Sequence, residues 1–290
     1  MALWHDKRGR FSPLRAVTLP FLIAPVIALI YFALVGDLGA RPRTEAIHEV
    51  GLWGLRFLMA SLFITPLRRI ARYALLIDVR RMIGVASFSY MVLHFILYIA
   101  DETYDMGVVV SEIVLRIYLT IGFTGWLGMM VLGLTSNDYM VRQLGGLRWR
   151  NLHRLVYPIT VLGCIHYFMQ SKLEVFEPTW ISGIFVWLML YRFLHWRFPR
   201  SDEFPLWVIA GTWFAVGALT FLLEALGFWI AFGAAPLRVL TADFTFQAGI
   251  RPGWYVWGAG AIVTAIGIIR MKPAGGGFQL AASSPGRTPS

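Results

Sequence analysis

Long apolar stretches constrain this chain more than any other feature, because 58% of its 290 residues are hydrophobic and only 14% are charged. Each stretch has about 17 to 25 residues, enough to cross a hydrocarbon core about 30 Å thick as a helix. The eight stretches run approximately over residues 17–36, 48–66, 82–100, 112–134, 153–170, 179–196, 206–230 and 253–270. The alternation of barrel strands is absent, and backbone groups in lipid must be satisfied within helices. The sequence therefore predicts an all-α, polytopic membrane bundle of about eight transmembrane helices.

The basic residues predict the orientation of this bundle. The net charge of +10 could suggest a nucleic-acid partner, but 19 of the 26 lysines and arginines lie before the first stretch, in every second loop and in the tail. The second loop alone holds Arg68, Arg69, Arg72, Arg80 and Arg81. Cytoplasmic loops carry the excess of basic residues in membrane proteins. We expect a multi-pass protein of the bacterial inner membrane with both termini in the cytoplasm.

Two features at the ends of the chain have simpler interpretations. A signal peptide is the competing interpretation of residues 1–36, but the apolar run is longer than the 7 to 15 residues of a signal core and no convincing cleavage site follows. Residues 273–290 are rich in glycine and serine and are expected to be a disordered cytoplasmic tail.

Glu224 lies within the seventh stretch, where we expect it near a helix end or hydrogen-bonded inside the bundle.

Two histidines lie deep in different apolar stretches. His94 lies 13 residues beyond Arg81 and His166 lies 12 residues beyond Arg154, so both are about 18 to 20 Å from the basic end. An ionisable group at this depth is costly and usually faces a cofactor, a partner or a water-filled cavity. Two imidazoles at one depth on two helices can hold a haem iron from opposite faces. The alternative is that each histidine only hydrogen-bonds to a neighbouring helix.

His153 differs from this pair because it lies at the basic start of the fifth stretch, between Arg150 and Arg154. An ideal helix turns His153 about 140° away from the face of His166. Pro158 can kink the helix between them, so both could still face inward. A second haem ligand, a quinone-site residue and a solvated surface histidine all remain open.

Arg56 and Arg116 are the two arginines that the sequence places inside apolar stretches. Arg56 is about 12 Å from the outer end of its stretch, and Arg116 is about 5 residues from the outer end of the fourth. Guanidinium groups bind carboxylates in two-pronged fashion, which suits the two propionates of a haem. Snorkelling to the interface is the alternative, and it is easier for Arg116 than for Arg56.

Six segments together resemble the MsrQ (YedZ) family, within the ferric-reductase-like transmembrane superfamily. They are PLRR at 66–69, RRMIG at 80–84, LH at 93–94, YLTIGFTGWLGMMVLGLTS at 118–136, WRNLHRLVY at 149–157 and IHY at 165–167. Their order and spacing extend the resemblance over roughly residues 15–200. The family's three histidines correspond to His94, His153 and His166.

The resemblance implies a membrane b-type cytochrome that takes electrons from the quinone pool. Its expected acceptor is a periplasmic molybdenum-containing subunit, MsrP, which reduces methionine sulfoxide in oxidised envelope proteins. It also implies FMN beside heme b, although no flavin site is evident in the sequence. Quinone could meet the cytoplasmic side near Arg80, Arg81 and His153, or elsewhere.

The resemblance also divides the chain. Residues 1–200 are expected to form a haem-binding core of six helices, and residues 201–272 two further spans beyond the six of shorter family members. One rival function is a ferric or oxygen reductase fed by a separate flavin reductase, because the chain has no strand–GxGxxG–helix segment of its own. The other is a non-redox membrane transporter, whose paired midplane carboxylates are not evident.

Overall fold

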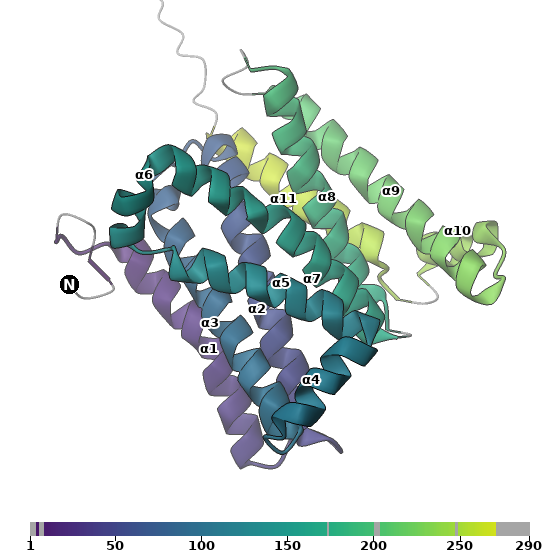
Figure 1. The fold of residues 1–290 in the computed structure, drawn as a ribbon. Coiled ribbons are helices and arrows are strands. Elements are labelled where there is room, and N and C mark those ends of the chain that lie inside the picture. Colours follow the sequence, from purple (N-terminus) through teal and green to yellow (C-terminus); the bar gives the residue numbers. More distant parts are fainter. Residues whose placement is uncertain (1–3, 6–8, 173, 200–203, 247–248, 271–290) are drawn as a thin grey trace, which may run out of the picture.

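In a computed structural model, the chain folds into a bundle of helices (Figure 1). The structure describes all residues except 1–3, 6–8, 173, 200–203, 247–248 and 271–290. In this described part every regular element is a helix, so the all-α prediction is confirmed. The predicted tail, residues 273–290, lies outside the described residues.

The helices follow one another along the chain with short connections. They are α1 (Pro13–Leu34), α2 (Pro42–Ile70), η1 (Ala74–Leu76), α3 (Ile77–Asp101), α4 (Met106–Leu115), α5 (Ile117–Leu134), α6 (Asp138–Leu152), η2 (His153–Leu155), α7 (Val156–Ser171), α8 (Phe176–Arg197), α9 (Leu206–Phe232), α10 (Pro236–Thr245) and α11 (Pro252–Arg270). All eight predicted stretches are largely helical.

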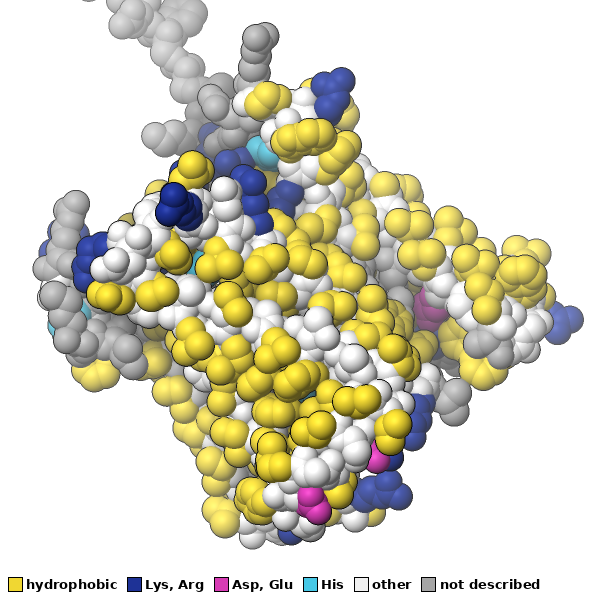
Figure 2. Space-filling view, viewed as in Figure 1, with side chains coloured by type: hydrophobic (Ala, Val, Ile, Leu, Met, Phe, Trp, Pro, Cys, Tyr) yellow, Lys and Arg dark blue, Asp and Glu magenta, His cyan; other side chains and the backbone are white. Residues whose placement is uncertain are grey.

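Six helices in the described part of the chain are long and apolar enough to cross a membrane: α1, α2, α3 with η1, α5, α9 and α11. The other two predicted spans are α7, which has only 16 residues, and α8, which carries charged residues near both ends. Figure 2 shows a broad apolar belt across the bundle, with basic side chains gathered around α6. The chain is a multi-pass membrane protein, and the number eight stays a prediction.

Helix α2 lies at the centre of the bundle and packs against α3, α7, α8 and α11. Polar side chains tie it to its neighbours through backbone carbonyls. The Ser87 hydroxyl donates to the carbonyl of Gly54 at 2.7 Å, and the Arg192 guanidinium donates to the carbonyl of Leu62 at 2.7 Å. Hydrogen bonds of this kind satisfy polar groups between helices in lipid.

A tyrosine from α3 is inserted into the backbone ladder of α1. The backbone N–H of Val26 donates to the Tyr90 hydroxyl at 3.2 Å, and that hydroxyl donates to the carbonyl of Leu22 at 2.9 Å. Pro25 lies inside α1 and lacks an N–H, which loosens the helix at this turn. Tyr90 therefore satisfies the opened turn and fixes α1 against α3.

One sequence prediction about helix boundaries is wrong. The stretch 112–134 is not one span, because Arg116 has extended backbone angles (φ −108°, ψ 108°) that separate α4 from α5. The Thr120 hydroxyl donates to the carbonyl of Ile113 at 2.6 Å and satisfies part of the broken ladder. Residues 138–152, between the fourth and fifth stretches, form the helix α6, which bends at Gly145, where φ is +74° and glycine is favoured.

The last three helices pack onto the bundle through aromatic side chains. Trp187 on α8 stacks on Trp213 on α9, with ring centres 4.0 Å apart and planes inclined by 13°. Both side chains are fully buried, and Cys164 of α7 belongs to the same core cluster. Helix α11 packs against α9 and also reaches α2.

Candidate functional site

The imidazoles of His94 on α3 and His166 on α7 lie beside each other, with ring centres 6.5 Å apart and planes at 83°. Two helix pairs bring them together, because α3 packs along α2 while α7 packs along α5. The proximity predicted from their equal depth is confirmed. Both side chains are half-buried.

Each imidazole is oriented by a backbone carbonyl of the neighbouring helix. Nδ1 of His94 lies 2.8 Å from the carbonyl oxygen of Ile47 on α2, and Nδ1 of His166 lies 2.8 Å from that of Tyr118 on α5. A carbonyl can only accept, so each Nδ1 carries the hydrogen and donates it. In a neutral ring this leaves the lone pair on Nε2, the state that a metal ligand needs.

The spacing of the two rings suits one metal ion between them. A coordinated imidazole nitrogen lies about 2.0 Å from a metal, and the ring centre lies roughly 1.2 Å behind that nitrogen. Two rings on one iron therefore have centres roughly 6.4 Å apart, close to the 6.5 Å between His94 and His166. The residues present fit the axial coordination of a haem iron, with an imidazole on each face.

Arg56, the deeper of the two predicted propionate ligands, is paired with a carboxylate from α8. Its guanidinium forms an ion pair with Glu177, and the Tyr167 hydroxyl donates to the other carboxylate oxygen at 3.1 Å. The guanidinium also lies 4.7 Å from the ring centre of Trp53. Tyr167 follows His166 in α7, so this helix links the half-buried network to the histidine pair.

Arg116 does not lie inside a membrane-spanning helix, so this part of the sequence prediction is wrong. It occupies the break between α4 and α5, where its side chain is 53% exposed. The guanidinium pairs with Glu112 one helical turn earlier and donates to the Tyr118 hydroxyl at 3.2 Å. The carbonyl of Tyr118 also accepts from His166, so Arg116 is linked to the histidine pair through Tyr118.

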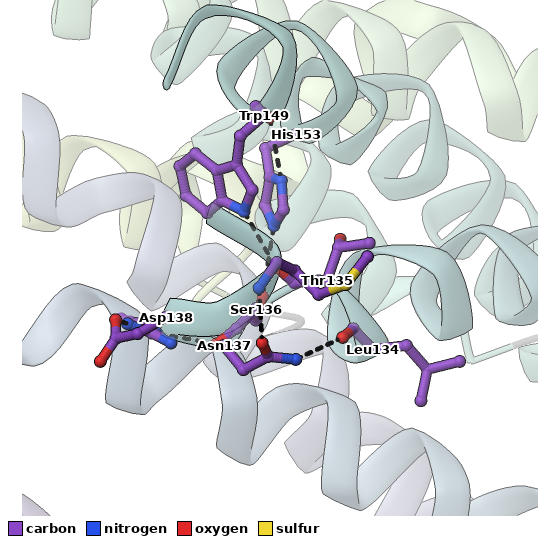
Figure 3. A network of polar contacts seen from close by, with 9 residues as sticks. Leu134, Thr135, Ser136, Asn137, Asp138, Trp149 and His153 are labelled. Atoms are coloured by element: carbon purple, nitrogen blue, oxygen red, sulfur yellow. Dashed lines mark hydrogen bonds and ion pairs between the residues drawn. The ribbon is translucent and has the colours of Figure 1, made fainter. Parts of the chain in front are cut away.

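His153 lies in a separate polar network, in η2 (Figure 3). Its Nε2 is 3.2 Å from the Ser136 hydroxyl, its Nδ1 is 3.1 Å from the Trp149 carbonyl, and its ring stacks on Trp149 at 3.9 Å. Arg81 donates to the Ser136 carbonyl at 2.7 Å and pairs with Asp138. The structure thus joins two of the residues predicted for the quinone side, His153 and Arg81, through Ser136.

The third residue predicted for that side, Arg80, acts on His153 by its charge. Burial lowers the pKa of His153, which lies outside the membrane-spanning helices, and the charges of Arg80 and Arg81 lower it further. Arg80 also lies within electrostatic reach of Arg192 and Arg68. Burial and these charges therefore favour the neutral imidazole of His153.

Several residues at the histidine pair were missed by sequence reasoning. His48 on α2 follows Ile47, and its Nε2 lies 3.0 Å from the Gln170 side-chain amide, one turn beyond His166. Gly51 and Gly122 lie directly against the two imidazole rings. Glycine recurs at every third residue of the fourth stretch, at Gly122, Gly125 and Gly128, which is a weak sequence signal for Gly122. Nothing in the sequence distinguishes Gly51 or His48.

Comparison with known proteins places this site in a family. Residues 50–164 match the family model described as "Ferric reductase like transmembrane component". The "Protein-methionine-sulfoxide reductase heme-binding subunit MsrQ" of Rhodospirillum rubrum is 39% identical over 192 residues, which cover 65% of this chain and 88% of that relative. The chain belongs to the MsrQ family.

Two further relatives are also MsrQ heme-binding subunits by name. That of Herminiimonas arsenicoxydans is 34% identical over 205 residues, covering 70% of this chain and 94% of the relative. That of Caulobacter vibrioides is 36% identical over 183 residues, covering 63% and 87%. These MsrQ proteins are shorter than the present chain, because each match covers more of the relative than of the chain. No solved structure matches the chain.

Proposed function

We propose that this chain is the haem-binding membrane subunit of a protein-methionine-sulfoxide reductase system. It passes electrons from the quinone pool to a periplasmic molybdenum-containing subunit of the MsrP type, which repairs oxidised envelope proteins. The observation that carries the proposal is the pairing of His94 with His166, each with its Nδ1–H donated to a carbonyl. Family membership supports it, since the relatives are named as heme-binding subunits.

His94 and His166 would hold one b-type haem non-covalently. The chain has a single cysteine and no CxxCH segment, so it lacks the motif that attaches haem covalently. When bound, the haem supplies reversible one-electron chemistry at its iron. The chain holds the imidazoles in the correct tautomer and places them among apolar helices, and these are the factors through which a protein tunes the potential.

The haem propionates need cationic partners, and Arg56 is the best placed. Its guanidinium is half-buried, its partner Glu177 also accepts from Tyr167, the chain neighbour of His166, and its five N–H donors exceed what Glu177 alone can use. Arg116 is a weaker candidate, because it is exposed and already paired with Glu112. We therefore assign the main propionate contact to Arg56, with Arg116 at the rim.

His153 is proposed to take up protons on the side where quinol is oxidised. In the neutral state, Nδ1–H donates to Trp149 and the Ser136 hydroxyl donates to Nε2. After protonation, Nε2–H donates to Ser136, whose hydroxyl turns to the carbonyl of Leu132, 2.7 Å away. Both states use contacts already present, so His153 can hold a proton released by quinol without leaving a donor unpaired.

The proposed direction of flow follows from the charge distribution. The end that holds Arg80, Arg81 and His153 is the basic one, which we place in the cytoplasm together with both termini, in a bacterial inner membrane. The acidic α3–α4 connection, with Asp101, Glu102 and Asp105, then faces the periplasmic acceptor. FMN rests on the family resemblance alone, and we assign no residue to it.

We also propose the division of the chain that the sequence suggested. Residues 1–200 form the haem-binding unit, and residues 201–272 add two spans, which correspond to α9 and α11. The short helix α10 between them connects their outer ends. The shorter lengths of the family relatives support treating these spans as an addition to the common core.

The function is tested with the purified full-length chain. We expect a low-spin b-type haem spectrum on reduction with dithionite, reduction of the same haem by a quinol analogue, and reoxidation by an added MsrP-type subunit with methionine sulfoxide. Haem reduction that requires NAD(P)H and a separate flavin reductase would favour a ferric or oxygen reductase. A purified chain that binds no haem would favour the alternative function, a non-redox membrane transporter. Reporter fusions at residues 101–111 and 67–81 test the orientation.

A further inference from the structure

The two imidazoles are held by the same arrangement of backbone and glycine. Ile47 supplies the carbonyl for His94, and Gly51 follows it by four residues on α2. Tyr118 supplies the carbonyl for His166, and Gly122 follows it by four residues on α5. The arrangement therefore occurs twice, once in each helix pair.

Both glycines leave space that the imidazoles occupy. A Cβ atom built on Gly51 would lie 2.7 Å from Nδ1 of His94, and one built on Gly122 would lie 2.6 Å from Nδ1 of His166. Contacts this short do not occur between side chains, so alanine at either position displaces the ring. Gly125, one turn along α5, has its nearest side-chain neighbour at 3.5 Å, an ordinary contact.

Helix geometry explains why a glycine is needed four residues after the carbonyl. A helical side chain points toward the N-terminus and covers the turn before its own Cα. A residue at position i+4 therefore shields the carbonyl of residue i from the side. A carbonyl oxygen has two lone pairs, of which the helix uses one. With glycine at i+4, an imidazole from another helix can reach the second.

We propose that Gly51 and Gly122 are positioning residues that fix the planes of the two haem-ligating imidazoles nearly at right angles. This inference rests on the proposed function, since it concerns the haem held by His94 and His166. Each ring must face its own carbonyl, and the two carbonyls belong to different helices. The resulting angle between the ring planes is 83°.

The angle between axial imidazole planes has a spectroscopic consequence. Perpendicular planes leave the two iron d orbitals that bind the imidazole π systems nearly equal in energy, and low-spin ferric haem then gives a strongly axial electron paramagnetic resonance signal. Parallel planes separate these orbitals and give a rhombic signal. The Nδ1–H bonds also make each imidazole a stronger donor, which stabilises ferric iron and lowers the midpoint potential.

The experiment compares Gly51→Ala and Gly122→Ala with Gly125→Ala in the purified full-length protein. The wild type and Gly125→Ala should give the strongly axial low-spin signal. Gly51→Ala and Gly122→Ala should each shift it toward a rhombic or high-spin signal and raise the midpoint potential. Gly84→Ala on α3, whose nearest neighbour is Ser61 Oγ at 3.8 Å, is a second control.

A double substitution separates positioning from a general packing defect. Gly122→Ala should lower the unfolding temperature of the otherwise wild-type chain, because the new methyl group meets the His166 ring. In a His166→Ala chain the ring is absent, so adding Gly122→Ala should cause no loss, since alanine favours helix over glycine. The same comparison applies to Gly51 with His94.

The outcomes distinguish failure of the positioning role of Gly51 and Gly122 from failure of the proposed haem-binding function. Low-spin haem that depends on His94 and His166 in a protein whose Gly51→Ala and Gly122→Ala variants match Gly125→Ala would overturn the positioning role alone. A rhombic signal from the wild type would overturn the perpendicular arrangement. Absence of low-spin haem from the wild type would overturn the proposed function itself.

Discussion

The histidine pair and the ion pairs around Arg251 are two polar centres of this bundle that are completed in different ways. At the first, His94 and His166 use one ring nitrogen each to bind a backbone carbonyl and leave the other nitrogen with a lone pair. At the second, Arg251 forms ion pairs with Glu224 and Asp243, which come from α9 and α10. The first centre keeps the Nε2 atoms of both imidazoles for a ligand. In the second centre, the charged groups form ion pairs with one another.

The second centre holds the C-terminal helices together. The side chains of Glu224 and Asp243 are 2% and 1% exposed, and Arg251 lies 5.6 Å from the ring centre of Phe228. The Trp254 indole donates to the Asp243 carbonyl at 3.0 Å. Glu224 is hydrogen-bonded inside the bundle, one of the two expectations drawn from its sequence position. In lipid, a buried ionic group of this kind persists because it is paired.

The difference shows how to separate functional from structural polar groups in a membrane bundle. Depth alone does not do so, because both centres contain ionisable residues within or beside spanning helices. What distinguishes them is the partner of each polar group. Arg251 faces the opposite charges of Glu224 and Asp243, whereas the two imidazoles face uncharged backbone carbonyls and keep Nε2 for a ligand. Four predictions test this account, and they are described from the largest expected effect to the smallest.

His94→Ala and His166→Ala should each abolish the low-spin haem, because a single imidazole cannot supply both axial ligands. The absorption spectrum of the reduced, purified variants measures the effect. His195→Ala is the matched control, since His195 is also half-buried and its Nδ1 also faces a backbone carbonyl, that of Tyr191 at 3.1 Å. A wild-type spectrum from either of the first two variants would contradict the pairing.

Arg251→Ala should destabilise the chain strongly and leave the spectrum of the remaining folded protein unchanged. Removing one partner of a buried ion pair costs about 3 to 5 kcal/mol, because the other charge stays buried and uncompensated. Thermal unfolding in detergent measures the loss, with exposed Arg238→Ala on α10 as the control. Unaltered stability together with altered haem would reverse the roles of the two centres.

His153→Ala should retain the haem but slow its reduction by a quinol analogue. Loss of a group that takes up a proton typically lowers a rate by roughly 100-fold or more. Stopped-flow reduction at several pH values measures the change, and dithionite reduction should stay as in the wild type. Complete loss of haem would make His153 an axial ligand, and loss of half would reveal a second haem.

Arg56→Ala should lower haem retention more than Arg116→Ala. Arg56 is half-buried between helices, whereas Arg116 is exposed at a helix break, where solvent screens the interaction of its charge with a propionate. Haem content after extended detergent washing compares the two. Equal, wild-type haem content in both variants would count against a propionate contact for Arg56.

The sequence predicted the histidine pair because helix rise is fixed, so counting residues from the basic anchors gives depth. It could not predict the carbonyls of Ile47 and Tyr118, since every residue carries the same backbone group and only packing selects one. The depth of Arg56 was predictable in the same way. Its partner Glu177 lies 121 residues away and depends on how α8 packs.

Arg116 shows where the reasoning from apolar runs failed. The residues around the break between α4 and α5 are apolar, with neither proline nor glycine at positions 115–117, so no local signal marks it. Helix α6 is also absent from the predicted elements. It lies outside the apolar stretches and is polar, so it has no apolar run that would indicate a spanning helix.

The most direct test of the central claim is the number of haems per chain in the wild type and in His153→Ala, measured as pyridine haemochrome against protein concentration. His94 and His166 together can ligate one iron, so we predict one haem per chain in both proteins. Two haems in the wild type, with one remaining in His153→Ala, would contradict the claim that this pair is the only haem site. Absence of haem from His153→Ala would contradict the pairing itself.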